Sequence, residues 1–305
     1  MSFTSTLKNE IINIEGTELE DISELSAILN LIGSKDEKIK LVTESVSVAK
    51  RVFNLIKKKY KKNCKITVRK GYSFNKKYTY ILEVDDKDDL IENELGINFE
   101  NKQLVPASFV VADEETKKAY LRGVFLSVGS LSDPKKSSYH LEFVLLNKDY
   151  AEFIMELLNS FNLNSKLIAR EKKYMVYIKE AERISDFLKV VGAGGGLFYF
   201  EDIRIYRDHK NMTNRLNNCE QANVDKTIEA SDKQIEDIEI IKEIGVFDAL
   251  DDKLKIVANY RLKYPDASLT ELGDIISYET STKISKSGVY HRMKKLQELA
   301  QKIRR

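Results

Sequence analysis

The C-terminal end of the chain carries the side chains best suited to binding a polyanion. The stretch from Lys283 to Arg305 contains eight lysines and arginines and one acid, Glu298. Lysine and arginine neutralise phosphates, while serine, tyrosine, histidine and arginine can also bond to base edges in a DNA groove. The candidate DNA contacts here are Ser285, Lys286, Ser287, Tyr290, His291, Arg292, Lys294 and Lys295. Base contacts are expected from Arg292 and Lys286. Phosphate contacts are expected from Lys294, Lys295, Lys302 and Arg304.

A second basic group lies in the first half of the chain. Between Lys57 and Lys77 there are ten lysines and arginines and no acid. Alternating polar and apolar residues predict a hairpin of strands 64–70 and 78–84, with Lys65, Thr67, Arg69 and the tyrosine rings on its outer face. A related basic group follows in the second half. The candidate DNA contacts of both groups are Lys65, Thr67, Arg69, Lys70, Lys166, Arg170, Lys172 and Lys173. The alternative is a solvated strand whose lysines protect an exposed edge.

Other candidate chemistry is weak. His140 lies two residues before Glu142, but no nucleophile accompanies the pair, which favours a structural or DNA-facing role. The glycines of 192–196 lack the Gly-Lys-Ser/Thr of a phosphate loop and predict a flexible turn. Cys64 and Cys219 are far apart, and with three histidines they support neither a zinc cluster nor a disulfide framework. The sequence therefore predicts no metal and no cofactor.

Composition sets broad limits on the protein class. The chain has 305 residues, of which 42% are apolar, enough for two globular domains. It begins without an apolar signal core, and no run approaches the ~18 apolar residues of a membrane span. We therefore expect a cytoplasmic protein without membrane contact. The net charge of +2 hides segregation, because residues 83–100 carry eight acids and one lysine. This acidic segment is expected to be a solvated surface connection rather than a mask over a basic surface.

The elements that must position these side chains occur twice. Residues 120–130 predict a buried helix in which Gly123 and Ser127 allow close approach of another helix, and Gly129 ends it with a positive φ. Residues 24–34 repeat this pattern more faintly. The apolar patterns of 49–56, 63–69 and 77–82 repeat at 151–158, 164–170 and 173–178. The sequence therefore predicts an α+β pseudo-dimer, with repeats at 1–105 and 106–210.

A helical linker is predicted at 211–248 and a separate helical domain at 249–305. The five asparagines of 211–223 could contact adenine edges or phosphates, or could cap helices and stabilise loops. A helix is then expected over 225–245. In the last domain, helix 254–263 ends at Tyr264 and Pro265, and Ser268 with Glu271 forms a capping box for helix 269–276.

The helix predicted at 285–296 turns Val289, Met293 and Leu296 inwards and leaves the basic residues outside. Helix, turn and basic second helix are the helix-turn-helix layout, in which the second helix enters the major groove. The alternative is a basic, solvated terminal helix.

The duplicated helix resembles the LAGLIDADG homing-endonuclease fold. Leu121, Gly123 and Gly129 match its motif, but Val128 stands at the position of the metal-binding acid, and Ile32 stands there in the first copy. Phosphodiester hydrolysis needs carboxylates to hold divalent ions, so the resemblance implies a nuclease that has lost its chemistry. The alternative is a nuclease that uses the displaced acids Asp36 and Asp133. Their different offsets from Gly33 and Gly129 argue against paired metal sites.

Nearly the whole chain resembles the WhiA family of bacterial sporulation and cell-division regulators. The resemblance is carried by residues 121–130, 133–134, 139–142, 200–201, 214–215, 218–220, 222–223 and 285–289. The sequence departs from the family at Gly194–Gly196 and lacks the paired cysteines common before each core helix. The resemblance implies a non-enzymatic, sequence-specific transcription factor on promoter DNA, acting on division or sporulation genes in the cytoplasm at the nucleoid. Other transcription factors and RNA polymerase are further candidate partners. The alternative is a scaffold whose basic faces bind an acidic protein or RNA.

Overall fold

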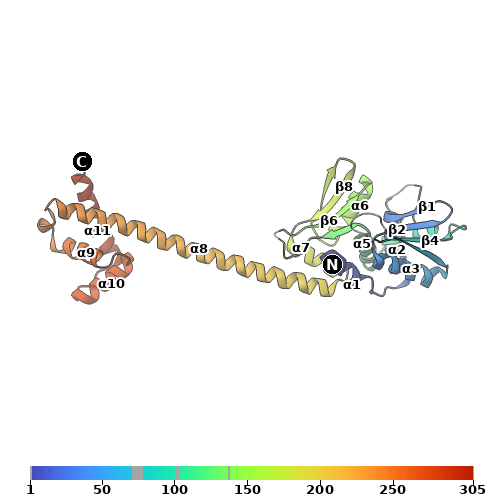
Figure 1. The fold of residues 1–305 in the computed structure, drawn as a ribbon, viewed down its shortest axis with the longest axis horizontal. Helices are drawn as coiled ribbons and strands as arrows, with labels where there is room; N and C mark the ends of the chain where they lie inside the picture. Colours follow the sequence, from blue (N-terminus) through green and yellow to red (C-terminus); the bar gives the residue numbers. More distant parts are fainter. Residues whose placement is uncertain (1, 71–77, 101–103, 137, 305) are drawn as a thin grey trace. The chain divides into compact units, whose positions relative to one another are not determined.

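The chain folds into two compact units, Met1–Arg207 and Asp208–Arg305, which one long helix connects (Figure 1). The structure is a computed structural model that describes residues 2–70, 78–100, 104–136 and 138–304. The predicted hairpin turn at 71–77 lies outside these residues. The connecting helix, α8 (Gly194–Glu243), begins in the first unit and ends in the second. Among the described helices, none is both long and apolar enough to cross a bilayer.

The first unit contains the predicted duplication. The elements of the first copy are α2 (Glu18–Ile32), β1 (Gly33–Lys35), β2 (Ile39–Thr43), α3 (Val46–Tyr60), β3 (Cys64–Lys70) and β4 (Tyr78–Val84). The elements of the second copy are α5 (Glu114–Val128), β5 (Gly129–Leu131), β6 (Leu141–Leu145), α6 (Lys148–Asn159), β7 (Lys166–Arg170) and β8 (Lys173–Ile178). Each copy forms an antiparallel sheet, in the orders β1-β2-β4-β3 and β5-β6-β8-β7. The two copies therefore share one topology.

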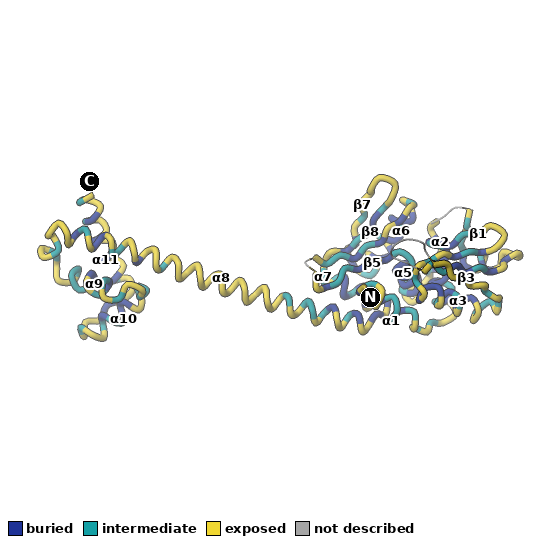
Figure 2. The backbone as a smooth tube through the Cα atoms, in the orientation of Figure 1, coloured by how far each residue is buried: buried dark blue, intermediate teal, exposed yellow. Residues whose placement is uncertain are grey.

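Shorter elements surround the two copies in the first unit. They are α1 (Phe3–Ile11), α4 (Leu90–Leu95), the 3₁₀ helix η1 (Ser108–Val111) and α7 (Ala181–Val190). The core of the unit lies where α2 and α5 pack against each other and against the inner faces of the sheets, and both helices are mostly buried (Figure 2).

Gly123 permits the close contact between α2 and α5. A Cβ at Gly123 would lie 2.4 Å from the carbonyl oxygen of Glu24 and 2.8 Å from the Cβ of Ala27. Both distances are shorter than non-bonded contact allows, so only glycine lets the two backbones meet here. The prediction of a small residue at the helix crossing is confirmed.

The prediction that Gly129 adopts a positive φ is wrong. Gly129 has φ −70° and ψ 141°, an extended conformation that any residue can adopt, and it begins β5 directly after α5. The need for glycine comes from packing instead, because a Cβ would lie 2.3 Å from Cδ2 of Phe125 and 2.8 Å from its Cα. Gly33 has the same role at the end of α2, where a Cβ would lie 2.4 Å from the carbonyl oxygen of Leu29.

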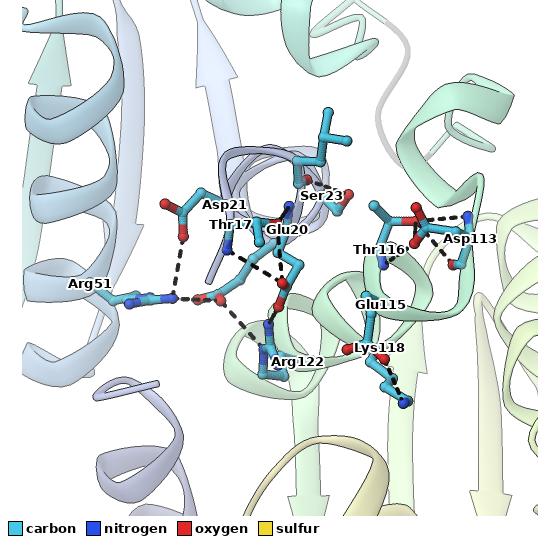
Figure 3. A network of polar contacts seen from close by, with 12 residues as sticks. Thr17, Glu20, Asp21, Ser23, Arg51, Asp113, Glu115, Thr116, Lys118 and Arg122 are labelled. Carbon is cyan, nitrogen blue, oxygen red and sulfur yellow. Dashed lines mark hydrogen bonds and ion pairs between the residues drawn. The ribbon is translucent and has the colours of Figure 1, made fainter. Parts of the chain in front are cut away.

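A buried network of charges joins α2 to its neighbours (Figure 3). Glu24 on α2 is fully buried and accepts two hydrogen bonds from Arg51 of α3, at 2.7 and 2.8 Å. Arg122 of α5 lies 3.6 Å from Glu24 and donates to Glu20 at 2.9 Å. A bidentate arginine–carboxylate pair is geometrically specific, and its cost of desolvation is offset only while both partners are present. The network therefore fixes α2 against both α3 and α5.

The glycines of 194–196 form the first turn of α8, and the prediction of a turn there is wrong. The turn is limited to Val191 and Gly192, which follow α7, and Gly192 has φ 79°. The N–H groups of Gly195 and Gly196 donate to the two carboxylate oxygens of Glu10 on α1, at 2.6 and 2.9 Å. A Cβ at Gly196 would lie 2.0 Å from Cδ2 of Leu7. Gly196 must be small because Leu7 of α1 covers it, and Glu10 neutralises the positive partial charge of this helix end.

Lys8 on α1 is partly buried, and its Nζ lies 5.6 Å from the ring centroid of Phe125. Burial lowers the pKa of Lys8 from its ordinary 10.5 to about 8. The unfolded chain therefore holds this proton more tightly, and the penalty on folding is complete below about pH 8 and relieved as the pH rises towards 10.5.

Replacing Lys8 by methionine should raise the free energy of unfolding at pH 7 by ~1–3 kcal/mol, because the penalty for burying the charge is removed. The variant should also lose the part of the stability that the wild type gains between pH 8 and 10. Urea denaturation across this pH range measures both effects, and Lys50→Met, at an exposed site on α3, is the control. Equal pH profiles for wild type and Lys8→Met would contradict the assignment.

The acidic segment forms a surface helix, α4, and loops that connect the two copies, as expected, but one of its acids anchors it to the first unit. Asp86 is fully buried and accepts hydrogen bonds from Lys62 and from the N–H groups of Ile91 and Glu92. Burial alone would raise the pKa of Asp86, but these hydrogen bonds outweigh it and lower the pKa. Lys59 pairs with Glu94 at 3.1 Å. The segment therefore neutralises part of the basic group that precedes it, while Ile91 and Leu95 complete the core.

The second unit is entirely helical in its described residues. It contains the C-terminal part of α8, η2 (Phe247–Ala249), α9 (Asp252–Lys263), α10 (Leu269–Thr280) and α11 (Lys286–Ile303). Its core joins Ile238 and Ile241 of α8 to Val257, Leu272 and Met293. The Asn-rich segment 211–223 belongs to α8 and its side chains are exposed. It therefore forms neither a loop nor a cap, and that alternative is wrong.

Candidate nucleic-acid interface

The pair α10 and α11 has the predicted helix-turn-helix geometry. At the start of α10, the Ser268 N–H donates to the Glu271 carboxylate at 2.7 Å, and the Glu271 N–H donates to Ser268 Oγ at 3.3 Å. This capping box was expected from the sequence and is confirmed. The hydroxyl of Ser277 fixes the turn, because it donates to the Gly273 carbonyl at 2.7 Å and accepts from the Ile284 N–H at 2.9 Å.

Gly273 lets the start of α11 approach α10. A Cβ at this position would lie 3.2 Å from the Ile284 carbonyl oxygen, tighter than an ordinary contact. Ser285 caps α11 by accepting a hydrogen bond from the Gly288 N–H at 3.2 Å. The two helices therefore meet at a fixed angle with the N-terminal turn of α11 presented to solvent.

The inward face of α11 is as predicted, since Val289, Met293 and Leu296 are buried. Opposite to this face, at i, i+4 and i+8 spacing, lie the exposed residues Ser287, His291 and Lys295. These three form the outer stripe of α11.

The remaining candidates on α11 lie beside the outer stripe. Tyr290 and Lys294 line a cavity of about 220 Å³ together with Lys233 and Asp237 of α8. Arg292 is partly buried, whereas Lys286 is exposed and lies at the first turn of the helix. Seven of the eight candidates of the sequence therefore share α11 but not one face of it, and Ser285 is the N-cap of this helix.

The ladders of the two sheets show which side chains point away from the helices. Cys64, Tyr80, Leu82 and Val84 pack on the core, so the residues that alternate with them form the outer face of the first sheet. On this face Lys65 pairs with Glu83, Thr67 with Ile81 and Arg69 with Thr79. The prediction for Lys65, Thr67 and Arg69 is confirmed as to face.

Two other expectations for this hairpin are wrong. Tyr80 pairs with Val68, and Tyr78 with Lys70, so these four residues lie on the side of the sheet that faces the helices. The apolar residues that alternate along β3 are not all buried, because Ile66 and Val68 are 45% and 53% exposed on the inner side of this edge strand. An apolar residue on the inner side of an edge strand can therefore remain exposed, because strand patterns depend on context as well as on alternation.

The second sheet repeats the arrangement. Lys166 pairs with Tyr177, and Arg170 with Lys173, on the face opposite the core residues Phe143 and Val176. Lys166 is therefore equivalent to Lys65, and Arg170 to Arg69. Arg170, Lys172 and Lys173 line a hollow of about 760 Å³ on this outer face. Lys172 itself lies in the turn between β7 and β8.

Acidic and apolar residues share the outer faces of the sheets with the lysines and arginines. His140 lies 3.1 Å from Glu142 and stacks on Tyr177 with ring centroids 5.8 Å apart. At the centre of the faces, Val42 is 45% and Val144 37% exposed. The outer faces are thus less uniformly basic than the candidate residues alone suggest.

The positions of the nuclease acids hold apolar side chains. Ile32 and Val128 end α2 and α5, and both are half-buried against the core. Asp36 is exposed in the β1–β2 turn, and Asp133 accepts the Lys135 N–H at 2.9 Å. Across the described part of the chain, no group of three or more acidic, histidine or cysteine side chains is arranged to hold a metal ion.

Comparison with known proteins identifies all three parts of the chain. Residues 18–98 match the WhiA N-terminal LAGLIDADG-like domain, residues 117–210 the WhiA LAGLIDADG-like domain and residues 213–300 the WhiA C-terminal HTH domain. A probable cell division protein WhiA from Oceanobacillus iheyensis is 41% identical and aligns with 100% of this chain and 98% of its own length. The corresponding protein of Bacillus mycoides is 42% identical with the same coverage.

Solved structures agree with this assignment. The crystal structure of full-length DUF199/WhiA from Thermatoga maritima aligns over 99% of both chains with a TM-score of 0.61 and 28% identity. The N-terminal LAGLIDADG domain of a DUF199/WhiA protein aligns over 63% of this chain and 92% of its own length, with a TM-score of 0.51. Two LAGLIDADG-like domains followed by a helix-turn-helix domain are the predicted fold class, and the chain belongs to the WhiA family.

Proposed function

We propose that this protein is a sequence-specific regulator that binds double-stranded promoter DNA and has no nuclease activity. The outer stripe of α11 carries the proposal, because it combines a short hydroxyl, an imidazole and a lysine on a helix held in helix-turn-helix geometry. Exposed basic side chains on the two sheets would add phosphate contacts, namely those of Lys65, Arg69, Lys166 and Arg170. The relatives named as probable cell division proteins support cell-division genes as targets.

The apolar residues at the two helix ends support the loss of hydrolysis. Ile32 and Val128 offer no oxygen to a divalent ion, and Asp36 and Asp133 lie in turns beyond the helices. RNA polymerase and other transcription factors are proposed partners at the promoter, which would place the protein at the nucleoid. Sporulation genes remain a second class of proposed target.

The test is selection of genomic DNA fragments by the intact protein at two salt concentrations with magnesium present. Selective retention of uncut fragments supports a regulator without nuclease activity. Cut DNA would restore the nuclease that uses displaced acids. Retention of no fragment over another, with capture of an acidic protein or RNA, would favour the scaffold.

Replacing Arg292 by alanine should weaken binding to a selected fragment by ~1–3 kcal/mol and relax the choice of site. Lys65→Ala should instead weaken binding to every sequence alike and reduce the slope of log K against log salt by about one unit. Fluorescence anisotropy with a selected and a scrambled duplex measures both. If each variant weakens binding to the selected and the scrambled duplex by the same amount, the division between base and phosphate contacts is wrong.

A further inference from the structure

A cavity in the second unit has the lining of an oxyanion site. It has a volume of about 220 Å³ and lies where α8 and α9 meet the first turns of α10 and α11. Three of its side chains are cations, Lys226, Arg261 and Lys286, and none is acidic. Hydroxyls of Thr227, Ser268 and Thr270 line it as well. Cations and hydroxyls without a carboxylate are the groups that bind phosphate oxygens.

Arg261 is the most informative of these side chains, because it is 2% exposed and no acidic side chain among the described residues pairs with its charge. Its Nε donates to Gln234 Oε1 at 3.0 Å, and its Nη1 donates to the carbonyls of Pro265 and Ala267 at 3.2 and 2.6 Å. These acceptors are neutral, and only burial shifts the pKa of Arg261, which it lowers.

The remaining nitrogen of Arg261 is free to bind a ligand. Within the described residues, Nη2 makes no hydrogen bond, yet it is not sealed from solvent. A buried guanidinium is ordinarily paired with a carboxylate, since burying an isolated charge is costly. An oxyanion in the cavity would supply the missing charge.

The N-termini of α10 and α11 add to the positive electrostatic potential in the cavity. The first N–H groups of an α-helix have no acceptor within the helix, and the aligned peptide dipoles place a positive partial charge there. At α10 the capping box uses the N–H groups of Ser268 and Glu271, which leaves those of Leu269 and Thr270. Lys286 is the first residue of α11 and brings both its N–H and its ammonium.

We infer that this cavity binds one phosphate-type oxyanion. The inference deepens the proposed function where the phosphate belongs to a bound duplex, since the start of α11 lies at the cavity rim. The same chemistry would equally take the phosphate of a free small molecule, which would make the cavity an effector site. Both sources require Lys226 of α8, a residue outside the two helices of the helix-turn-helix.

The test compares the full chain with two double variants of equal charge change. Lys226→Gln/Lys286→Gln removes two cavity cations. Lys233→Gln/Lys283→Gln changes neighbouring exposed lysines on α8 and before α11, neither of which lines this cavity. Inorganic phosphate is titrated into each protein by calorimetry, first without DNA. Wild type and the control should bind it, and the cavity variant should bind it about tenfold or more weakly.

A second arm repeats the titration with a selected duplex bound and measures the salt dependence of DNA binding. If the ligand is a DNA phosphate, inorganic phosphate competes with the duplex and the cavity variant loses about one to two units of salt slope relative to the control. If the ligand is a free phosphorylated molecule, phosphate binds equally well with the duplex in place.

The inference is overturned if wild type and the cavity variant bind phosphate equally well, or if neither binds it, and the cavity variant also has the same salt slope of DNA binding as the control variant. A wild-type chain that binds no DNA would refute the proposed function, while the titration without DNA would still decide on the oxyanion site.

Discussion

Replacing Glu24 by alanine is expected to lower the free energy of unfolding of the first unit by ~3 kcal/mol or more. The change leaves the guanidinium groups of Arg51 and Arg122 buried with one acidic partner fewer. Asp21, 3.8 Å from Arg51, and Glu20, 2.9 Å from Arg122, compensate only in part. The chain has no tryptophan, so urea denaturation followed by circular dichroism is the suitable measurement.

Glu18→Ala is the matched control for this prediction. Glu18 lies on the same helix and pairs with Lys59 at 2.8 Å, but its side chain is 77% exposed. An exposed ion pair contributes little to stability, so this variant should unfold close to wild type. Similar losses from Glu18→Ala and Glu24→Ala would show that the buried network has no special weight.

A single methyl group added at Gly123 should cost ~3 kcal/mol and reduce the yield of folded protein. The Cβ of Gly123→Ala would meet a backbone oxygen of α2, which cannot rotate away as a side chain does, so the two helices must separate along their whole contact. Thermal denaturation should show an early transition of the first unit with the second unit unchanged.

Gly194→Ala tests whether the loss comes from close packing or merely from substituting glycine. A Cβ at Gly194, the first residue of α8, would have no neighbour within 4 Å. Alanine favours helix over glycine by ~1 kcal/mol, so this variant should be neutral or slightly more stable. A loss of stability equal to that of Gly123→Ala would remove the packing explanation.

The duplication and the helix-turn-helix could be predicted because both rest on local patterns. The capping box of Ser268 and Glu271, and the buried stripe of Val289, Met293 and Leu296, depend on residues within one or two turns. The same holds for the match of Lys65 and Arg69 to Lys166 and Arg170, which the strand ladders reproduce.

The errors arose where side-chain packing decides which residue fits, whether the neighbour lies one helical turn away, as Phe125 does from Gly129, or far along the chain, as Leu7 does from Gly196. Gly129 and Gly196 look like turn residues, but Phe125 and Leu7 occupy the space where their Cβ atoms would lie. The tyrosine patterns align Leu82 with Ile178, whereas the ladders place it level with Val176, since Leu82 pairs with Ile66 and Val176 with Leu167. Side-chain similarity alone does not set strand register when hairpin lengths differ.

The cavity side chains outside α11 could not be found from the sequence. Lys226 and Arg261 belong to elements far from the basic terminus, and the neighbours of Lys226 do not distinguish it from an ordinary surface residue. The one available signal was the arginine in Tyr260–Tyr264, which lies among apolar residues without an acid at helical spacing. The strings that carry the family resemblance include Lys286 of this cavity but neither Lys226 nor Arg261.

The sheet of the first unit occurs twice in the chain and α11 occurs once, so the chain as a whole is asymmetric. The two sheets carry equivalent lysines, Lys65 and Lys166, whereas α11 has no second copy among the described helices. A surface made of two like halves fits a near-palindromic sequence read from either end, but a single reading helix does not. A promoter that engages both parts would hold the protein in one orientation, so that upstream and downstream neighbours meet different faces of it. Inverting such a site in front of a gene, without changing its bases, would then change the regulatory outcome.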